Sequence, residues 1–285
     1  MNIKMNIIDV QEIQGGLKII ARKTDSEYNG MLRLFLEIGA MMLVAGAEIN
    51  RVEDTLSRMG EAYGAAEMNV FVITSSIVVT MVIDDVSPEK GNIHREFTQT
   101  RRIKNSGGTN FMNIERLYFL SNRFCKTPMN ENTLAIEINK IKKAHYPQKL
   151  FYLGSILAAG SFAMFFGGNL LDGIIAAVVA VFICIMQDKL SFVMPNQVTF
   201  NVICALLSGL LIGVCAIFIP SLNPDKVMIG DIMLLIPGIA MTNAIRDILV
   251  GDTIAGSFRF MESFLWAGAL ACGFMLSMFI LSGIF

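Results

Sequence analysis

One apolar stretch, residues 227–250, contains the residues best suited to handle a charged solute. They are Pro237 and Gly238 in its middle, followed by Asn243, Arg246 and Asp247. Proline removes a backbone donor and glycine loosens the chain, so a helix here is expected to kink or split. A second half that begins near Gly238 would present unpaired N–H groups and a positive dipole end, which attract a carboxylate. A proline kink retained only for helix packing would explain the same residues.

The polar residues after this break suggest a binding and coupling role. Asn243 and Asp247 stand four residues apart, so they share one face of a helix, and Arg246 lies on the next face. Ionisable groups inside a membrane are costly and often functional. Asp247 is suited to take up and release a proton, and Arg246 to attract a carboxylate. Alternatively, both anchor the helix at the cytoplasmic edge. Asp172 and Asp231 are interpreted as interfacial residues near outer helix ends.

A second polar group lies in the N-terminal half. Glu48 and Arg51 are three residues apart and can pair on a helix surface, with Glu37 three turns earlier on the same stripe. A surface ion pair explains these residues, but together with Glu53 they also suit a gate or docking surface at a pore entrance. Asp252 is a further candidate for gating or coupling, although a turn explains it equally well. No nucleophile with an acid/base pair supports catalysis.

The elements that must hold these residues divide at about residue 150. Before it lie 19 of the 23 Lys/Arg and 17 of the 24 Asp/Glu, whereas only eleven charged residues follow it. The mean hydropathy of +0.57 is high for a soluble protein. No basic block alternates with aromatic residues, so nucleic acid is not expected as a partner. Two histidines and five cysteines without a CxxC motif predict neither a metal site nor a cofactor.

The apolar half predicts five transmembrane helices, because each of five stretches is long enough to cross about 30 Å of hydrocarbon. These stretches are 150–168, 170–186, 198–219, 227–250 and 264–285. Gly209 and Gly213 have the GxxxG spacing that suits close helix contacts. Three of the four basic residues here, all except Lys226, fall on the side of the N-terminal domain. That domain is therefore expected in the cytoplasm, with the C-terminus outside.

The polar half predicts an α+β domain large enough to bury its own core. Apolar residues recur every three or four positions over 31–63, which predicts one long helix ending at Gly64. The other expected elements are one or two strands over 69–83, a strand over 97–103, a turn at 105–108, and helices over 112–125 and 130–143. The predicted organisation is an N-terminal segment (1–29), a cytoplasmic α+β domain (30–147) and a five-helix transmembrane domain (148–285).

Two stretches carry a resemblance to a known family. The first is AGAEINRVEDTL at 45–56, and the second combines IPG at 236–238, NAIRD at 243–247, Gly251-Asp252, Ala255-Gly256 and Glu262. Together they resemble the threonine/serine exporter family of bacterial membrane proteins. The chain is similar to the larger partner of the split members associated with succinate export. The resemblance implies export of threonine, serine or a dicarboxylate, with a second small membrane protein or a homo-oligomer as partner.

The pattern as a whole favours a subunit of a secondary active exporter in the bacterial plasma membrane, coupled to protons and moving small carboxylate-bearing metabolites. A membrane-tethered hydrolase is one alternative, and a regulatory subunit that does not itself transport is another. An anchor needs only one span and has no use for a polar break, so the five expected spans favour transport over an enzyme.

Overall fold

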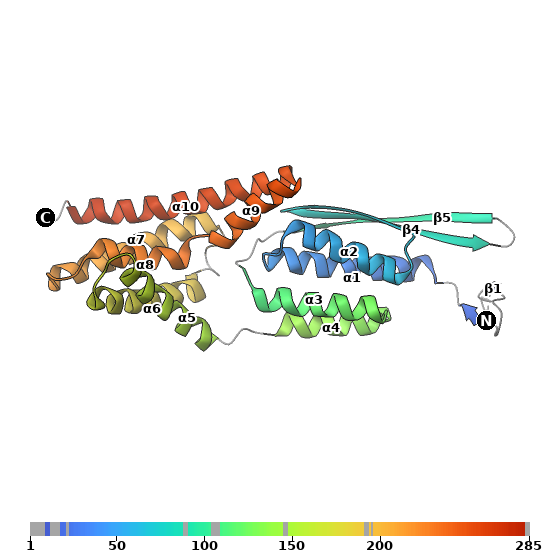
Figure 1. Cartoon of the computed structure of the whole chain (residues 1–285), viewed down its shortest axis with the longest axis horizontal. Coiled ribbons are helices and arrows are strands. Elements are labelled where there is room, and N and C mark those ends of the chain that lie inside the picture. The colour runs from blue at the N-terminus through green and yellow to red at the C-terminus, as the bar shows by residue number, and fades with distance from the viewer. Residues whose placement is uncertain are drawn as a thin grey trace. The chain divides into compact units, whose positions relative to one another are not determined.

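The computed structural model describes residues 9–11, 18–20, 23–87, 91–103, 109–144, 148–190, 194 and 196–282. The chain divides into two compact units, one formed by residues 1–144 with 249–255 and the other by residues 145–248 with 256–285. Figure 1 labels their helices and strands. The first unit combines helices and strands, and the described part of the second is helical.

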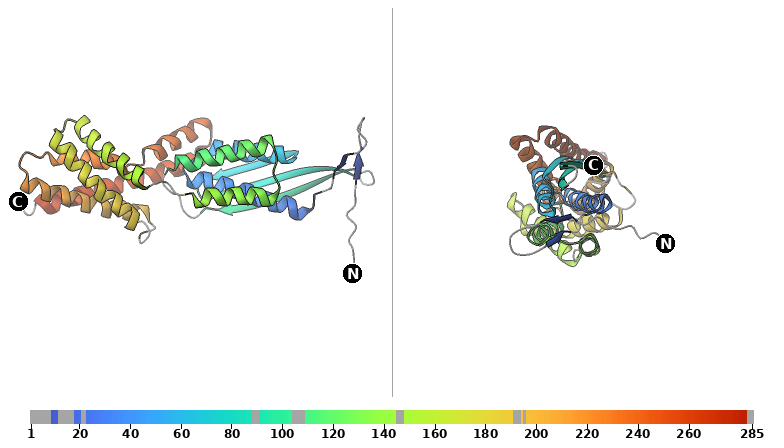
Figure 2. Two further views of the ribbon diagram at one scale, coloured as in Figure 1. Left: turned by 90° about the horizontal axis from the view of Figure 1, so that it is seen from below. Right: turned by 90° about the vertical axis from the view of Figure 1, so that its right-hand side faces the viewer.

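The first unit has three layers. Helices α1 (Asp25–Val44) and α2 (Ile49–Tyr63) lie between an antiparallel sheet on one side and α3 (Phe111–Lys126) and α4 (Glu131–Lys143) on the other (Figures 1 and 2). The sheet has the order β3 (Glu67–Ile73), β4 (Ser76–Ser87) and β5 (Gly91–Arg102). A separate antiparallel pair consists of β1 (Asp9–Gln11) and β2 (Lys18–Ile20).

Most predicted elements of this unit are present. The stretch 69–83 forms two strands, β3 and β4, joined by a two-residue turn at Thr74–Ser75. The strand expected over 97–103 is the second half of β5. Helices α3 and α4 match the two predicted helices within two residues at each end, and Asn130 caps α4 by accepting a hydrogen bond from the Thr133 N–H. The turn expected at 105–108 lies outside the described residues.

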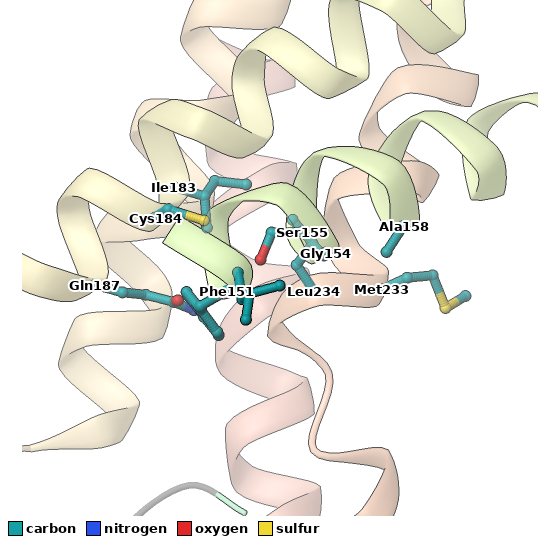
Figure 3. Close-up of a pocket in the computed structure, with 10 residues that line it drawn as sticks. Phe151, Gly154, Ser155, Ala158, Ile183, Cys184, Gln187, Met233 and Leu234 are labelled. Carbon is teal, nitrogen blue, oxygen red and sulfur yellow. The ribbon is translucent and has the colours of Figure 1, made fainter. Parts of the chain in front are cut away.

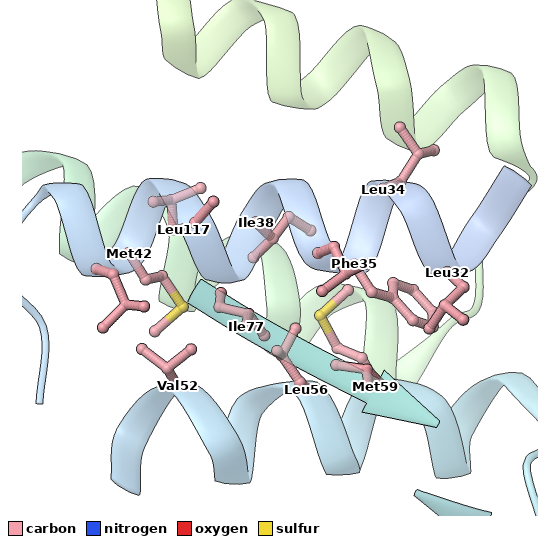
Figure 4. Close-up of a cluster of buried hydrophobic side chains, with 14 of the residues drawn as sticks. Leu32, Leu34, Phe35, Ile38, Met42, Val52, Leu56, Met59, Ile77 and Leu117 are labelled. Carbon is pink, nitrogen blue, oxygen red and sulfur yellow. The ribbon is translucent and has the colours of Figure 1, made fainter. Parts of the chain in front are cut away.

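The single long helix predicted over 31–63 is wrong, because the chain breaks into α1 and α2 at residues 45–48. Gly46 has a φ of +87°, a conformation that favours glycine. A Cβ at this position would also lie 3.1 Å from the Thr109 Oγ1. The apolar spacing continues through the break because both helices face the same core, where Phe35, Ile38 and Leu56 are fully buried (Figure 4).

The second unit contains six helices among its described residues. They are α5 (Gln148–Phe165), α6 (Leu170–Leu190), α7 (Gln197–Phe218), α8 (Pro224–Leu235), α9 (Gly238–Val250) and α10 (Thr253–Ser282). Three of them, α6, α7 and α10, are long and apolar enough to cross a membrane, and α8 with α9 qualifies as one bent span. The described residues thus support three or four of the five predicted spans, and a crossing by α5 stays a prediction.

The last span begins earlier than predicted. Hydropathy placed its start at residue 264, because Arg259 and Glu262 resemble loop residues. The structure instead has one 30-residue helix, α10, that includes both of them. Arg259 is accommodated in this helix because its guanidinium is ion-paired with Asp247 of α9. Hydropathy alone does not reveal this pairing, so it places the start of the helix too late.

Small residues let α7 and α10 approach closely. A Cβ added at Gly209 would collide with Ser277, and one at Gly213 would collide with Leu281. From the other helix, a Cβ at Gly273 would lie 2.5 Å from a backbone carbonyl oxygen of α7. The close helix contacts predicted from the GxxxG spacing are therefore confirmed.

Candidate functional site

The break predicted at Pro237 and Gly238 is present. Helix α8 ends at Leu235, α9 begins at Gly238, and the two helices are bent by 55°. The Gly238 N–H donates to the Ile236 carbonyl at 2.9 Å, and helical bonding of α9 starts where the Met241 N–H donates to the Pro237 carbonyl at 3.0 Å. The N–H groups of the first turn therefore lie outside the i→i−4 ladder and point along the axis at the positive end of the helix dipole.

The second half of the broken span carries a buried ion pair. Arg259 of α10 donates from Nη1 to Oδ2 of Asp247 at 3.2 Å, and the two side chains are 12% and 2% exposed. Arg246, which the sequence suggested as the neighbouring cation, is exposed. A charge-assisted hydrogen bond in apolar surroundings is strong, so this pair ties α9 to α10. The sequence analysis missed Arg259 because it comes from a different helix.

Glycines bring α9 and α10 close enough for this pair. Gly251, between the two helices, has a φ of +117° and allows the chain to reverse. A Cβ at Gly256 would lie 2.8 Å from the Ala244 carbonyl oxygen, so no larger residue fits without a shift. Asn243 is half-buried on the same face of α9 as Asp247. The amide of Asn243 and the Asp247–Arg259 pair therefore lie on one face of α9.

A cavity of about 340 Å³ lies among α5, α6 and α8 (Figure 3). Most of its lining is apolar or small, and the polar groups are the Ser155 hydroxyl, the Cys184 thiol and the Gln187 amide. Its volume is within the range of small-molecule sites. Met233 and Leu234 of the lining belong to the last turn of α8, just before the break at Pro237. The cavity therefore adjoins the bend, which the sequence analysis did not foresee.

Asp172 and Asp231, the two carboxylates interpreted as interfacial, are both fully buried within the protein, and their position near a membrane interface stays a prediction. Asp172 accepts hydrogen bonds from the Asn169 N–H at 2.7 Å, the Asn223 N–H at 2.8 Å and the Asn223 Nδ2 at 3.0 Å. It therefore ties the start of α6 to the loop before α8. Asp231 is fully buried, and neither oxygen has a hydrogen-bond partner within the described residues. Asp172 thus lies near a helix end, in the first turn of α6, whereas Asp231 lies in the interior of α8.

The predicted gating residues of the first unit are distributed over α2. Glu48 occupies the N-cap position, and exposed Arg51 lies with its guanidinium 5.9 Å from the centre of the Tyr118 ring. Glu53 accepts a hydrogen bond from the Val72 N–H at 2.9 Å, which joins α2 to β3. Glu37 does not share their stripe, because it lies on α1.

The last predicted gating residue, Asp252, lies in the connection between α9 and α10. Its Oδ2 is buried without a hydrogen-bond partner in the part of the chain that the structure describes. In that same part, no three His, Cys, Asp or Glu side chains are grouped so that they could hold a metal ion.

Comparison with known proteins links this geometry to transport. A family model described as "Putative threonine/serine exporter" matches residues 33–281. The Probable succinate transporter subunit YjjP of Klebsiella aerogenes is 25% identical over 260 residues, which cover 89% of this chain and 95% of that protein. No solved structure matches the chain.

Proposed function

The chain belongs to the threonine/serine exporter family, and from this premise we propose that it is a subunit of a secondary active exporter of small carboxylate-bearing metabolites. The substrate is threonine, serine or a dicarboxylate such as succinate, and the proton gradient drives its export. A second small membrane protein completes the exporter, as the word subunit in the name of the relative suggests. The chain lies in the plasma membrane with its N-terminal unit in the cytoplasm.

The observation that carries this proposal is the bend between α8 and α9. Transporters use discontinuous helices to aim helix N-termini at anionic substrate groups near the middle of the membrane. Pro237 and Gly238 create such a terminus, and the adjoining cavity offers space beside it. The carboxylate common to threonine, serine and succinate is the group that such a terminus attracts. We therefore assign Pro237 and Gly238 to substrate binding.

The polar face of α9 supplies the rest of the proposed site. Arg246 is exposed and attracts the substrate carboxylate, and Asn243 offers an amide that can donate or accept a hydrogen bond. Asp247 acts through Arg259, since their ion pair sets the position of α9 against α10. Breaking this ion pair would free α9 to move relative to α10.

The first unit would regulate access to the transport path. We assign the gate or docking surface to Glu48, Arg51 and Glu53 of α2, together with Asp252 between α9 and α10. Exposed Arg51 is available to an acidic group of a partner chain, and Glu53 holds β3 to α2 through its hydrogen bond with the Val72 N–H. An oligomer of this chain is a second way to complete the path.

Efflux from loaded cells tests the proposal. Cells loaded with labelled threonine or labelled succinate would express the chain with and without a small membrane protein of the same family. Gradient-driven efflux of one substrate above the level of empty-vector cells is expected, and Arg246→Ala with Asp247→Asn should abolish it at equal expression. Efflux that persists unchanged in this double variant would refute the site. No efflux of either substrate under any pairing would favour a regulatory subunit.

A further inference from the structure

Asp231 is the one fully buried carboxylate for which no hydrogen bond or ion pair occurs within the described residues. It lies in the middle of α8, in the first half of the bent span. The neighbouring Gly230 packs tightly, since a Cβ there would lie 2.6 Å from the Ala159 carbonyl oxygen of α5. Helix α8 therefore cannot turn this carboxylate outward without separating from α5.

The surroundings of Asp231 are polar but uncharged. Ser208 of α7 is fully buried, and its hydroxyl also has no hydrogen-bond partner within the described residues. Cys204, one turn earlier on α7, lies within electrostatic range of Asp231 and of Cys184 on α6. Across the helices packed against α8, the titratable group within electrostatic range of Asp231 is therefore the Cys204 thiol, and no charged group is among the described neighbours.

Asp172, the other carboxylate of these helices, does not share this situation. Its oxygens accept three hydrogen bonds, from Asn169 and from Asn223. Transferring an ionised carboxylate to apolar surroundings costs several kcal/mol unless it is paired or hydrogen-bonded. Asp172 can therefore be buried as an anion. Asp231 has no such hydrogen bonds, so burying it as a neutral carboxylic acid costs less than burying it as an anion. Asp247, the third buried carboxylate, is already neutralised by Arg259.

The cavity lies beside the part of α8 that carries Asp231, because Met233 and Leu234 line it. The cavity also reaches Ser155 and Cys184. Figure 3 shows the two side chains adjacent on α5 and α6. Cys184 is in turn within electrostatic range of Cys204, the neighbour of Asp231. Water that enters the cavity when the helices separate would therefore approach the carboxylate.

We propose that Asp231 is a proton-binding site of the helical unit: it holds a proton while α8 is packed against α5 and α7, and releases it when these helices separate and water enters. The proton moves between Asp231 and water, so no further reactant is needed. A metal cation is disfavoured, because it needs several oxygen ligands and the described neighbours of Asp231 offer one hydroxyl and one thiol. This coupling role rests on the proposed function. It assigns proton binding to Asp231 in place of Asp247, because Asp247 is ion-paired.

Chemical modification of the purified full chain tests proton binding without any transport. Dicyclohexylcarbodiimide enters apolar regions and attacks protonated carboxyl groups, and mass spectrometry locates the adduct. At neutral pH we expect an adduct on Asp231 in the wild-type chain, less of it as pH rises, and none on Asp172. The absence of an Asp231 adduct throughout the pH range would overturn the proposal. Protection of Asp231 by Na⁺ at constant pH would overturn it in favour of a cation site.

The pH dependence of stability gives a second readout that does not depend on reagent access. The folded chain binds a proton at Asp231 that the unfolded chain releases at neutral pH, so the melting temperature should fall as pH rises through neutrality. Asp231→Asn should remove this part of the pH dependence, whereas Asp225→Asn, an exposed carboxylate at the start of the same helix, should keep it. Equal slopes in the wild type and Asp231→Asn would contradict the proposal.

Coupling itself is tested by comparing two modes of transport. Asp231→Asn should lose gradient-driven export to the level of empty-vector cells but retain exchange of labelled for unlabelled substrate, and Asp225→Asn should retain both. Full gradient-driven export by Asp231→Asn would overturn the coupling role while leaving the exporter assignment intact. A wild-type chain that exports nothing would refute the proposed function, and the modification and melting experiments would still decide whether Asp231 binds a proton.

Discussion

Breaking the Asp247–Arg259 pair from one side should destabilise the helical unit by about 3–5 kcal/mol, the range for a buried pair that loses one partner. The two side chains are 2% and 12% exposed, so the remaining charge has little access to water. Arg259→Ala should be the more severe change, because the anion it leaves is the more deeply buried of the two. Asp247→Asn keeps the shape and should fall at the lower end of the range.

Replacing both charges should restore much of this loss. Asp247→Leu combined with Arg259→Met removes the pair and leaves no unpaired charge, and such exchanges are often neutral or stabilising. The assay is the free energy of unfolding of the purified full chain in mixed micelles, measured for the wild type, both single variants and the double variant. Lys189→Ala, which removes an exposed cation of α6, is the control, and a change within about 0.5 kcal/mol is expected for it. Arg246→Ala is measured beside it.

Additive effects of the two single substitutions on the free energy of unfolding would refute this reasoning. If the two single effects sum to the double effect within about 0.5 kcal/mol, the two charges do not interact and the reasoning about α9 and α10 fails. A large loss in Arg246→Ala would refute it as well, because Arg246 would then be the cation that holds Asp247.

Three further outcomes follow from particular contacts. Gly273→Ala should lower the melting temperature, with a cost of about 1–3 kcal/mol from overpacking against α7, whereas Gly268→Ala, where a Cβ would meet nothing within 4 Å, should be neutral or slightly stabilising. Asp172→Ala should cost about 2–4 kcal/mol, because three hydrogen-bond donors lose their acceptor, and Asp172→Asn should recover part of it in the same melting assay. Glu53→Ala should increase hydrogen exchange at the Val72 amide by about fivefold or more, for a bond worth about 1 kcal/mol, and unchanged exchange would show that this hydrogen bond does not hold β3 to α2.

Local chemistry explains which parts of the fold could be predicted. The strands over 69–83 and the helices α3 and α4 follow from β-branched runs, caps and periodic apolar residues, which act over a few positions. The bend at Pro237 was also predictable, because proline acts on the backbone of its own helix. The break between α1 and α2 was not, since one apolar face continues through it and only Gly46 marks the turn.

The candidate site was predicted less completely, for a different reason. Pro237, Gly238 and Asp247 stand out as unusual residues in an apolar stretch, and hydropathy finds such residues without knowing their neighbours. The partner of Asp247 comes from another helix, because Arg259 lies twelve residues further along the chain on α10. Whether a buried carboxylate is ion-paired, hydrogen-bonded or alone depends on packing between helices, so the distinct roles of Asp172, Asp231 and Asp247 required the structure.

The free thiols of the helical unit allow its motion to be measured without added labels. Cys204 is enclosed between helices, whereas Cys272 is exposed on α10. A small alkylating reagent will modify Cys272 at a rate set by the reagent, but it reaches Cys204 only when the helices separate. The ratio of these two alkylation rates therefore reports how often the helices separate, and it can be measured in the wild-type chain.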